Sequence, residues 1–201
     1  AFMRIVQYKR NQTLLMEIPP SLPEQFTADP VVARALITQA LADGRSHLNE
    51  YEAMQLLAAY SIPVAETWMA HSPEEAAAIA ARLNQPVALK IISPSLVSKS
   101  QIGGVARYLT TPEAVRQMAA TMLAQLPTLA PTAKVDGFVV QPIIARDGAY
   151  ELALGVRHGG GFGPVIYFGQ GGVEAEVIND LAYGLPPFNM HLAREIMAQT
   201  R

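Results

Sequence analysis

Short runs of strand-forming residues, separated by segments that carry helix-start signals, constrain the fold of this chain more than any other feature. The runs rich in β-branched and aromatic residues are 66–70, 87–92, 105–109, 138–144, 151–157 and 165–168. The early runs alternate with helical segments, whereas the later ones follow one another. This order favours α+β lobes with antiparallel strands over a doubly wound parallel sheet.

Local caps predict where the helices begin. Asn49 with Glu52 three residues later is a capping box, and Ser72–Pro73 and Thr111–Pro112 place a proline at the first helical position. The helices predicted in this way, with two that are marked by apolar spacing, cover residues 31–42, 49–57, 72–83, 111–126 and 189–200. The glycine-dense stretch 155–172 predicts tight turns between antiparallel strands.

The first thirty residues differ from the rest in their proline content. Pro19, Pro20, Pro23 and Pro30 resist both helix and sheet. We therefore expect residues 1–30 to be the tail of a preceding domain followed by a linker.

Composition excludes several classes of protein. Of the 201 residues, 50% are hydrophobic and 16% are charged, which is enough apolar surface for a core. The net charge of −2 does not indicate the excess of basic residues that nucleic-acid binding requires. No apolar run approaches the roughly 20 residues that cross a bilayer. The absence of cysteine excludes a thiol nucleophile and thiolate zinc sites. We expect a cytoplasmic protein without nucleic-acid or membrane partners.

Lys90 is the first residue that suggests chemistry. It lies inside Pro86–Ile91, a run otherwise suited to burial, and an ammonium group is costly to bury without a partner. Such a lysine could hold an anionic phosphate. Alternatively, it could lie on an edge strand and extend to water. The run alone does not decide between the two.

The following loop and a later acidic segment could serve the same ligand. Residues 93–105 combine hydroxyls, Lys99 and the pair Gly103–Gly104, which would let backbone N–H groups approach phosphate oxygens, although a plain hairpin loop explains them too. Further along, Glu174, Glu176 and Asp180 are carboxylates of the kind that Mg²⁺ prefers, or else solvated surface charge.

Taken in order, these pieces resemble the ATP-grasp portion of ADP-forming acyl-CoA synthetases. The resemblance covers roughly residues 48–188 and is carried by LNEYEA at 48–53, PVALKI at 86–91, the loop 93–105, VQ at 140–141, ELALGV at 151–156, FGPV at 162–165, GQGGV at 169–173, and residues 176–180. It implies an ATP-grasp fold, in which two α+β lobes hold ATP and Mg²⁺ in a cleft between them. The lobes would span 31–136, with a helical entry, and 137–201, truncated at its C-terminus.

The resemblance also implies roles for individual residues. Lys90 corresponds to the family's phosphate-binding lysine, with Lys99 in the loop and Gly103–Gly104 as the turn that covers the phosphates. Gln141 and the backbone of Ile143 would meet adenine, and Glu151 would lie on the facing strand. The implied magnesium ligands are Glu176 and Asp180.

Several positions depart from the family. Where the synthetases carry His-Lys-Ser-Asp, with a histidine thought to accept the phosphoryl group, this chain has Ser98-Lys99-Ser100-Gln101. The family's Asp-Pro is Gly159–Gly160, and an expected arginine is Gly184. Phosphoryl transfer through an imidazole needs the imidazole. We therefore expect no catalytic residue and no synthetase turnover.

The flanking segments resemble bacterial protein lysine acetyltransferases of the Pat type. The resemblance is carried by residues 2–12 and 185–194. It implies a regulatory synthetase-like region that senses nucleotide or acyl-CoA, within a parent N-acetyltransferase that also carries CoA-binding and GNAT domains. Two alternatives stay open: an active subunit that interconverts acid, ATP and CoA with acyl-CoA, ADP and phosphate, and a scaffold that binds no ligand.

Overall fold

The computed structural model describes residues 2–16, 27–96, 103–144, 148–172 and 180–200. Contacts divide the chain into two units, residues 24–145 and residues 146–201 with 1–23. Each unit has a sheet of its own, and each is described by itself. None of the helices in the described ranges is long and apolar enough to cross a membrane.

The unit formed by residues 24–145 is built on a four-stranded antiparallel sheet. Its strand order is β1-β4-β2-β3, with β1 at Trp68–Ala70, β4 at Gly137–Pro142, β2 at Val87–Ile92 and β3 at Val105–Leu109. The inner strands, β4 and β2, are the most deeply buried, as expected for strands that carry apolar residues on both faces. This arrangement confirms the predicted α+β class.

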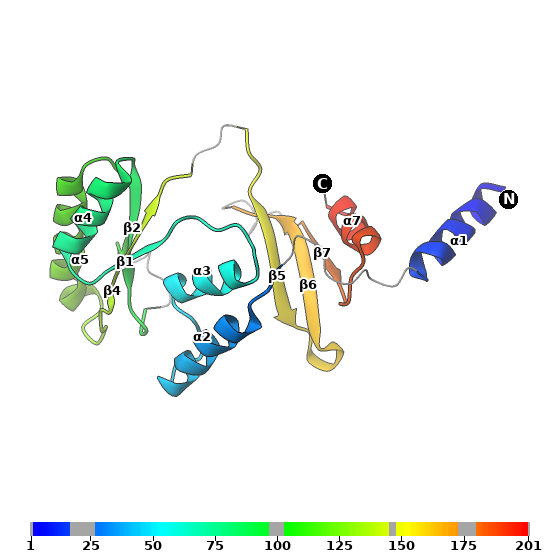
Figure 1. Cartoon of the computed structure of the whole chain (residues 1–201), viewed down its shortest axis with the longest axis horizontal. Coiled ribbons are helices and arrows are strands. Elements are labelled where there is room, and N and C mark those ends of the chain that lie inside the picture. The colour runs from blue at the N-terminus through cyan, green and yellow to red at the C-terminus, as the bar shows by residue number, and fades with distance from the viewer. Residues whose placement is uncertain (1, 17–26, 97–102, 145–147, 173–179, 201) are drawn as a thin grey trace. The chain divides into compact units, whose positions relative to one another are not determined.

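Two helices cover one face of this sheet, α4 at Pro73–Leu83 and α5 at Pro112–Leu129 (Figure 1). Their small and apolar side chains pack on Val87, Leu89 and Ile91 of β2. The other members of this core include Ala76, Val115, Ala119, Met122, Phe138 and Val140, all at most 5% exposed. Burial of this apolar surface is the main favourable contribution to folding of the unit.

The other face of the sheet looks toward α2, at Pro30–Ala42, and α3, at Glu50–Ala59 (Figure 1). The Asp29 carboxylate caps α2 by accepting from the N–H groups of Val31 and Val32. Asn49 and Glu52 form the predicted capping box of α3. These caps satisfy N–H groups that a helix leaves without internal partners, so they fix where each helix begins.

The other unit holds a three-stranded antiparallel sheet of order β5-β6-β7. Its strands are β5 at Leu152–His158, β6 at Pro164–Gln170 and β7 at Leu181–Gly184. A short 3₁₀ turn at Gly160–Phe162 joins β5 to β6, as the glycine-dense sequence predicted. The helix α7, at Met190–Ala198, packs on β6 and β7, with Asn189 as its N-cap.

Three features differ from the sequence expectations. Strand β7 was not predicted, because four residues ending in glycine show no clear alternation. A helix, α1, spans Phe2–Leu15 inside the expected connector; the prolines that suggested a connector begin only at Pro19. We expected the second lobe to start at residue 137, but β4 lies between β1 and β2 in the first sheet. The division between the units therefore follows Ala145.

Candidate functional site

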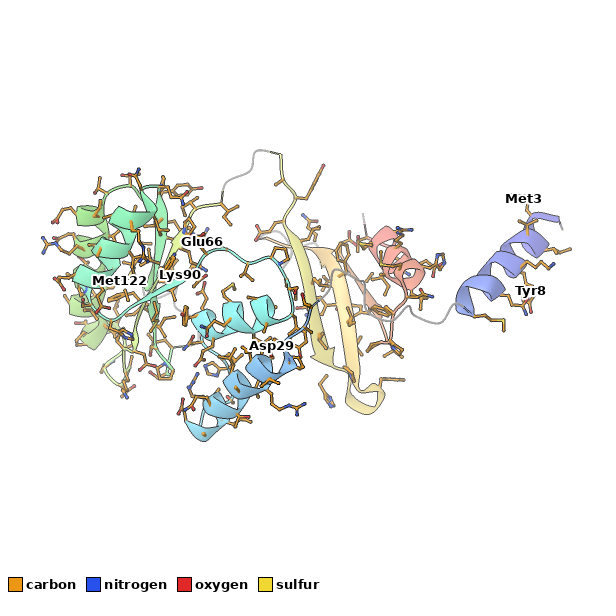
Figure 2. The ribbon with its side chains drawn as sticks, in the orientation of Figure 1. Met3, Tyr8, Asp29, Glu66, Lys90 and Met122 are labelled. Carbon is orange, nitrogen blue, oxygen red and sulfur yellow. The ribbon has the colours of Figure 1, made fainter. Side chains whose placement is uncertain are left out.

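Lys90 is the one β2 residue that is not buried, and it points away from the helix-covered core. Its neighbours Leu89 and Ile91 face α4 and α5, so strand alternation turns Lys90 toward the side on which α3 lies (Figure 2). The Lys90 side chain is 25% exposed. Because β2 lies between β4 and β3, the edge-strand interpretation of this lysine is wrong.

A continuous row of hydrogen bonds runs across this face of the sheet. The ammonium of Lys90 donates to the Glu50 carboxylate and, at 2.8 Å, to Oε1 of Gln141. Nε2 of Gln141 donates to Oγ1 of Thr67 at 2.8 Å, and Thr67 in turn donates to the carbonyl of Ala65 at 2.9 Å. Each side chain therefore fixes the orientation of the next one.

The row places a cationic group beside buried polar neighbours. Gln141 is only 7% exposed, and its amide has partners at both ends. A buried amide with both ends satisfied holds its position well, because breaking either bond would leave a polar group unpaired. Lys90 is thus a pre-oriented cation, held on a rigid strand rather than on a loop.

The glycine pair leads directly into the strand next to Lys90. Gly103 adopts a φ of +69°, which favours glycine, and the carbonyl of the buried Gly104 accepts from the N–H of Ile91 at 2.8 Å. Val105 pairs with Lys90 across the sheet. The structure therefore brings Gly104 close to Lys90. Ser98 and Lys99 lie outside the described residues.

Ile143 follows β4 and faces Pro86, which precedes β2. Its N–H donates to the carbonyl of Pro86 at 2.9 Å. In an antiparallel sheet such residues normally exchange two hydrogen bonds, but proline has no N–H to return the second one. The carbonyl oxygen of Ile143 is thus not paired with Pro86, so it is the backbone group that suits a ligand donor.

The candidate acids lie in the other unit. Glu151 precedes β5, and Asp180 precedes β7, at the same end of the sheet. The N–H of Gly171 donates to the Glu151 carbonyl at 2.7 Å, and the N–H of Gln170 donates to the Asp180 carbonyl at 3.2 Å. Glu151 and Asp180 therefore flank the end of β6. Glu176 lies outside the described residues. Among the residues that are described, no group of three or more His, Asp and Glu side chains could hold a metal ion.

A second charged cluster stabilises the start of α3. Arg45 donates two hydrogen bonds to the Glu52 carboxylate, at 2.7 and 2.8 Å, and Glu52 also accepts from the N–H of Asn49 at 2.8 Å. The hydrogen bonds from Arg45, ahead of the weaker one from the Asn49 backbone, hold the pKa of Glu52 below its ordinary value although burial opposes the shift. This cluster fixes the helix turn from which Glu50 reaches Lys90.

Sequence reasoning missed Glu50 and Thr67 as members of the row. Glu50 was visible only as an acid beside a capping box, and it lies 40 positions from Lys90. Thr67 lies 74 positions from Gln141. Contacts at such separations leave no local pattern. A pocket of about 250 Å³ opens next to Glu50, with Arg45, Ser93 and Asp136 among its lining residues.

Comparison with known families gives a match over most of the chain. The family described as ATP-grasp domain matches residues 39–201. This range includes the whole hydrogen-bonded row and the sheet of the other unit.

Curated relatives and solved structures agree with that match. The chain is 31% identical to the beta subunit of acetate–CoA ligase [ADP-forming] II of Pyrococcus furiosus, over 84% of this chain and 71% of that one. It is 29% identical to 4-hydroxybutyrate–CoA ligase [ADP-forming] of Nitrosopumilus maritimus, over 90% of this chain but 26% of that protein. The chain thus spans about a quarter of the length of that ligase.

Crystal structures of acetyl-coenzyme A synthetase 1 from Ca. Korarchaeum cryptofilum have a similar fold. The complex with coenzyme A and Ca-AMPCP aligns with a TM-score of 0.77 at 33% identity, covering 83% of this chain and 72% of that one. A second complex, with coenzyme A and Mg-AMPPCP, aligns with a TM-score of 0.68 at 30% identity. In that enzyme a phosphohistidine segment points toward the nucleotide-binding site.

Proposed function

The chain belongs to the ATP-grasp domain family, in the group of ADP-forming acyl-CoA synthetases, and from this premise we propose that it binds a magnesium nucleotide and has lost the synthetase reaction. The observation that carries the binding proposal is Lys90. An ammonium group projects from an inner strand, on the face opposite the core, and is held by an ordered amide.

The described residues fit the parts of a nucleotide. The Lys90 ammonium would bind phosphate oxygens, and the backbone around Gly103 and Gly104 would donate to the same group. The adenine amino group would donate to the carbonyl oxygen of Ile143, which Pro86 leaves unpaired. Gln141 was expected to meet adenine, but both ends of its amide are bonded to Lys90 and Thr67, so its contribution to binding would be to orient Lys90.

Magnesium is part of this proposal because carboxylates with substrate phosphates are its usual ligands. Asp180 and Glu151, at one end of the second sheet, and Glu176 are the candidate ligands. The ion would neutralise charge on the phosphates. The relative from Ca. Korarchaeum cryptofilum has been crystallised with Mg-AMPPCP, which is consistent with this choice of ligand.

Titration calorimetry with ATP and Mg²⁺ tests nucleotide binding. Lys90→Met keeps the length of the side chain and removes its charge, so we expect the affinity to fall at least about tenfold, since hydrogen bonds to charged groups are the strong ones. Lys134→Met, at an exposed position, is the matched control and should bind like the unchanged protein. Equal affinity of the two variants for ATP would show that Lys90 does not bind the phosphates.

The structure supports loss of synthetase chemistry at two of the departing positions. A Cβ added at Gly184 would lie 2.4 Å from Cδ1 of Ile196 and 2.6 Å from Cζ of Phe188. A Cβ at Gly159 would lie 2.4 Å from Cγ2 of Val165. Neighbouring side chains therefore fill the space that the family's arginine and aspartate would need. Together with Ser98 in place of histidine, this supports a remodelled site that does not form acyl-CoA.

The proposal extends to a regulatory role, in which this domain controls an acetyltransferase domain of the same protein. It is supported by the resemblance of residues 2–12 and 185–194 to Pat-type proteins. In such a protein, nucleotide or acyl-CoA bound here would control acetyl transfer by a GNAT domain. The coding sequence downstream of Arg201 tests this directly, because it must encode a GNAT domain if the proposal holds.

The second candidate is an active ADP-forming ligase subunit, favoured by the 31% identity to the Pyrococcus furiosus beta subunit. Incubation with acetate, CoA, ATP and Mg²⁺ tests this, since formation of acetyl-CoA would refute the first candidate. Ser98→His adds a sharper measurement. Acid-labile phosphate on this variant, and its absence from Ser98→Ala, would show that the rest of the phosphoryl-transfer site has survived.

A further inference from the structure

Glu50 is the only acidic side chain that the described residues bring into contact with the Lys90 ammonium. It is the first residue of α3, and its side chain is 22% exposed while that of Lys90 is 25% exposed. Glu50 also helps to line the pocket of about 250 Å³. The contact is therefore open to solvent on one side and to small solutes.

The carboxylate engages one of the ammonium donors that would otherwise be available to a phosphate. An ammonium group has three donors, and here Glu50 and Gln141 engage two of them. A phosphate that approached the same nitrogen would meet a second negative charge at contact distance. Because like charges repel most strongly at short range and in partly desolvated surroundings, the two anions oppose each other.

Lys90 does not need Glu50 to keep its position. The stem of Lys90 is fixed by the inner strand β2, and Gln141, itself bonded to Thr67, holds the amine from the other side. Helix α3 does not need Glu50 either, because its N-terminus is capped by Asn49 and Glu52. Within the described part of the chain, the one hydrogen bond or ion pair that Glu50 makes beyond its own helix is thus the pair with Lys90.

We propose that Glu50 is a built-in anionic competitor, which occupies the phosphate subsite at Lys90 until a nucleotide phosphate displaces it. This inference rests on the proposed nucleotide function. Binding then requires the first turn of α3 to release Lys90, which links nucleotide occupancy to the position of α3. The carboxylate lowers the affinity of the site for nucleotide. It also excludes anions of lower charge, since only a polyanion gains enough binding free energy from Lys90 to displace Glu50.

The test is the affinity of Glu50→Gln for ATP in EDTA, which removes divalent ions and isolates the contact between amine and phosphate. Glutamine keeps the shape of the side chain and removes its charge. We expect binding about fivefold tighter than in the unchanged protein, as suits a partly exposed ion pair. Glu74→Gln makes the same charge change on α4, across the sheet, and should leave affinity unchanged.

The outcomes separate this inference from the proposed function. If the unchanged protein binds ATP and Glu50→Gln binds it equally or more weakly, the proposed role of Glu50 as a competitor is refuted and nucleotide binding stands. If only Glu50→Gln binds measurably, both are supported. If neither variant binds ATP at millimolar concentration, in EDTA or with Mg²⁺, the nucleotide function fails and the competitor fails with it. If both bind ATP only with Mg²⁺, and with equal affinity, the competitor alone is refuted.

A second measurement needs no nucleotide. Loss of the carboxylate leaves the Lys90 amine without its ion-pair partner. Acetic anhydride should therefore reach and acetylate Lys90 several-fold faster in Glu50→Gln, relative to Lys134 in the same sample. Mass spectrometry of peptides reports both rates. An unchanged ratio would show that Glu50 does not hold Lys90 in solution, and it would overturn the proposal.

Discussion

Nζ of Lys90 donates a 2.8 Å hydrogen bond to Oε1 of Gln141, although 51 positions separate the two residues. They meet because β2 and β4 are adjacent, with Ala88 opposite Gln141 and Lys90 opposite Val139. A step of two residues along β2 therefore brings the lysine diagonally to the glutamine on the same face. The orientation of Lys90 is thus a product of strand register.

Replacement of Gln141 should disturb both stability and binding. Gln141→Leu removes the amide that links Lys90 to Thr67, and we expect a loss of about 1–2 kcal/mol in unfolding free energy because buried partners become unpaired. Nucleotide affinity should fall as well, since the Lys90 amine loses the hydrogen bond that orients it. Urea unfolding and calorimetry measure the two effects. Gln117→Leu, on the exposed side of α5, is the control and should change neither.

The pair of Arg45 and Glu52 should make stability depend on pH in the acidic range. The hydrogen bonds from Arg45 hold the pKa of Glu52 below its ordinary 4.5 in the folded protein. The folded state therefore binds the Glu52 proton more weakly than the unfolded state does. This stabilisation is fully present above about pH 4.5, and it is lost as the pH falls through the lower, folded pKa.

Arg45→Gln tests that dependence. We expect it to lower the unfolding free energy by about 1 kcal/mol at pH 7, and to flatten the decline below pH 4.5. Urea unfolding across pH 3 to 7 measures both quantities. Arg116→Gln breaks a pair with Glu113 in which both side chains are exposed, at 48% and 68%, and should have little effect. Parallel pH curves for Arg45→Gln and the unchanged protein would contradict the prediction.

Close packing at Gly184 should make even a methyl group costly there. A Cβ at this position would approach Ile196 and Phe188 to less than 3 Å. We expect Gly184→Ala to lose about 1–3 kcal/mol of stability, since overpacking forces neighbours out of their rotamers. Gly161→Ala is the control, because no atom lies within 4 Å of its added Cβ. Equal midpoints of thermal unfolding would show that Phe188 and Ile196 leave room for a side chain.

Local signals predicted much of the fold. The predicted N-caps Asn49, Ser72 and Thr111 are all confirmed, because a cap depends on residues two or three positions away. Strands β2 and β3 have the predicted bounds. In contrast, β7 is too short to show a period, and its place beside β6 depends on pairing with distant residues.

The site was only partly predictable for the same physical reason. The sequence indicated Lys90, since a charge in an apolar strand is conspicuous whatever surrounds it. It could not indicate Glu50, because an acid in the first turn of a helix is common and its contact with β2 depends on how α3 packs. The division after Ala145 was missed because β4 was assigned by order along the chain, whereas its pairing places it within the first sheet.

Pro86 should determine how well the site recognises adenine. Pro86→Ala adds an N–H opposite the Ile143 carbonyl, and we expect it to complete the pair of hydrogen bonds that the sheet geometry allows. The carbonyl would then be engaged, and ATP affinity should fall roughly three- to tenfold, which is the value of one neutral hydrogen bond. Inosine triphosphate lacks the amino group of adenine, so its affinity should be the same for both proteins. Equal losses for the two nucleotides would mean that the substitution acts on folding or on the phosphate site, and that the Ile143 carbonyl does not bind the base.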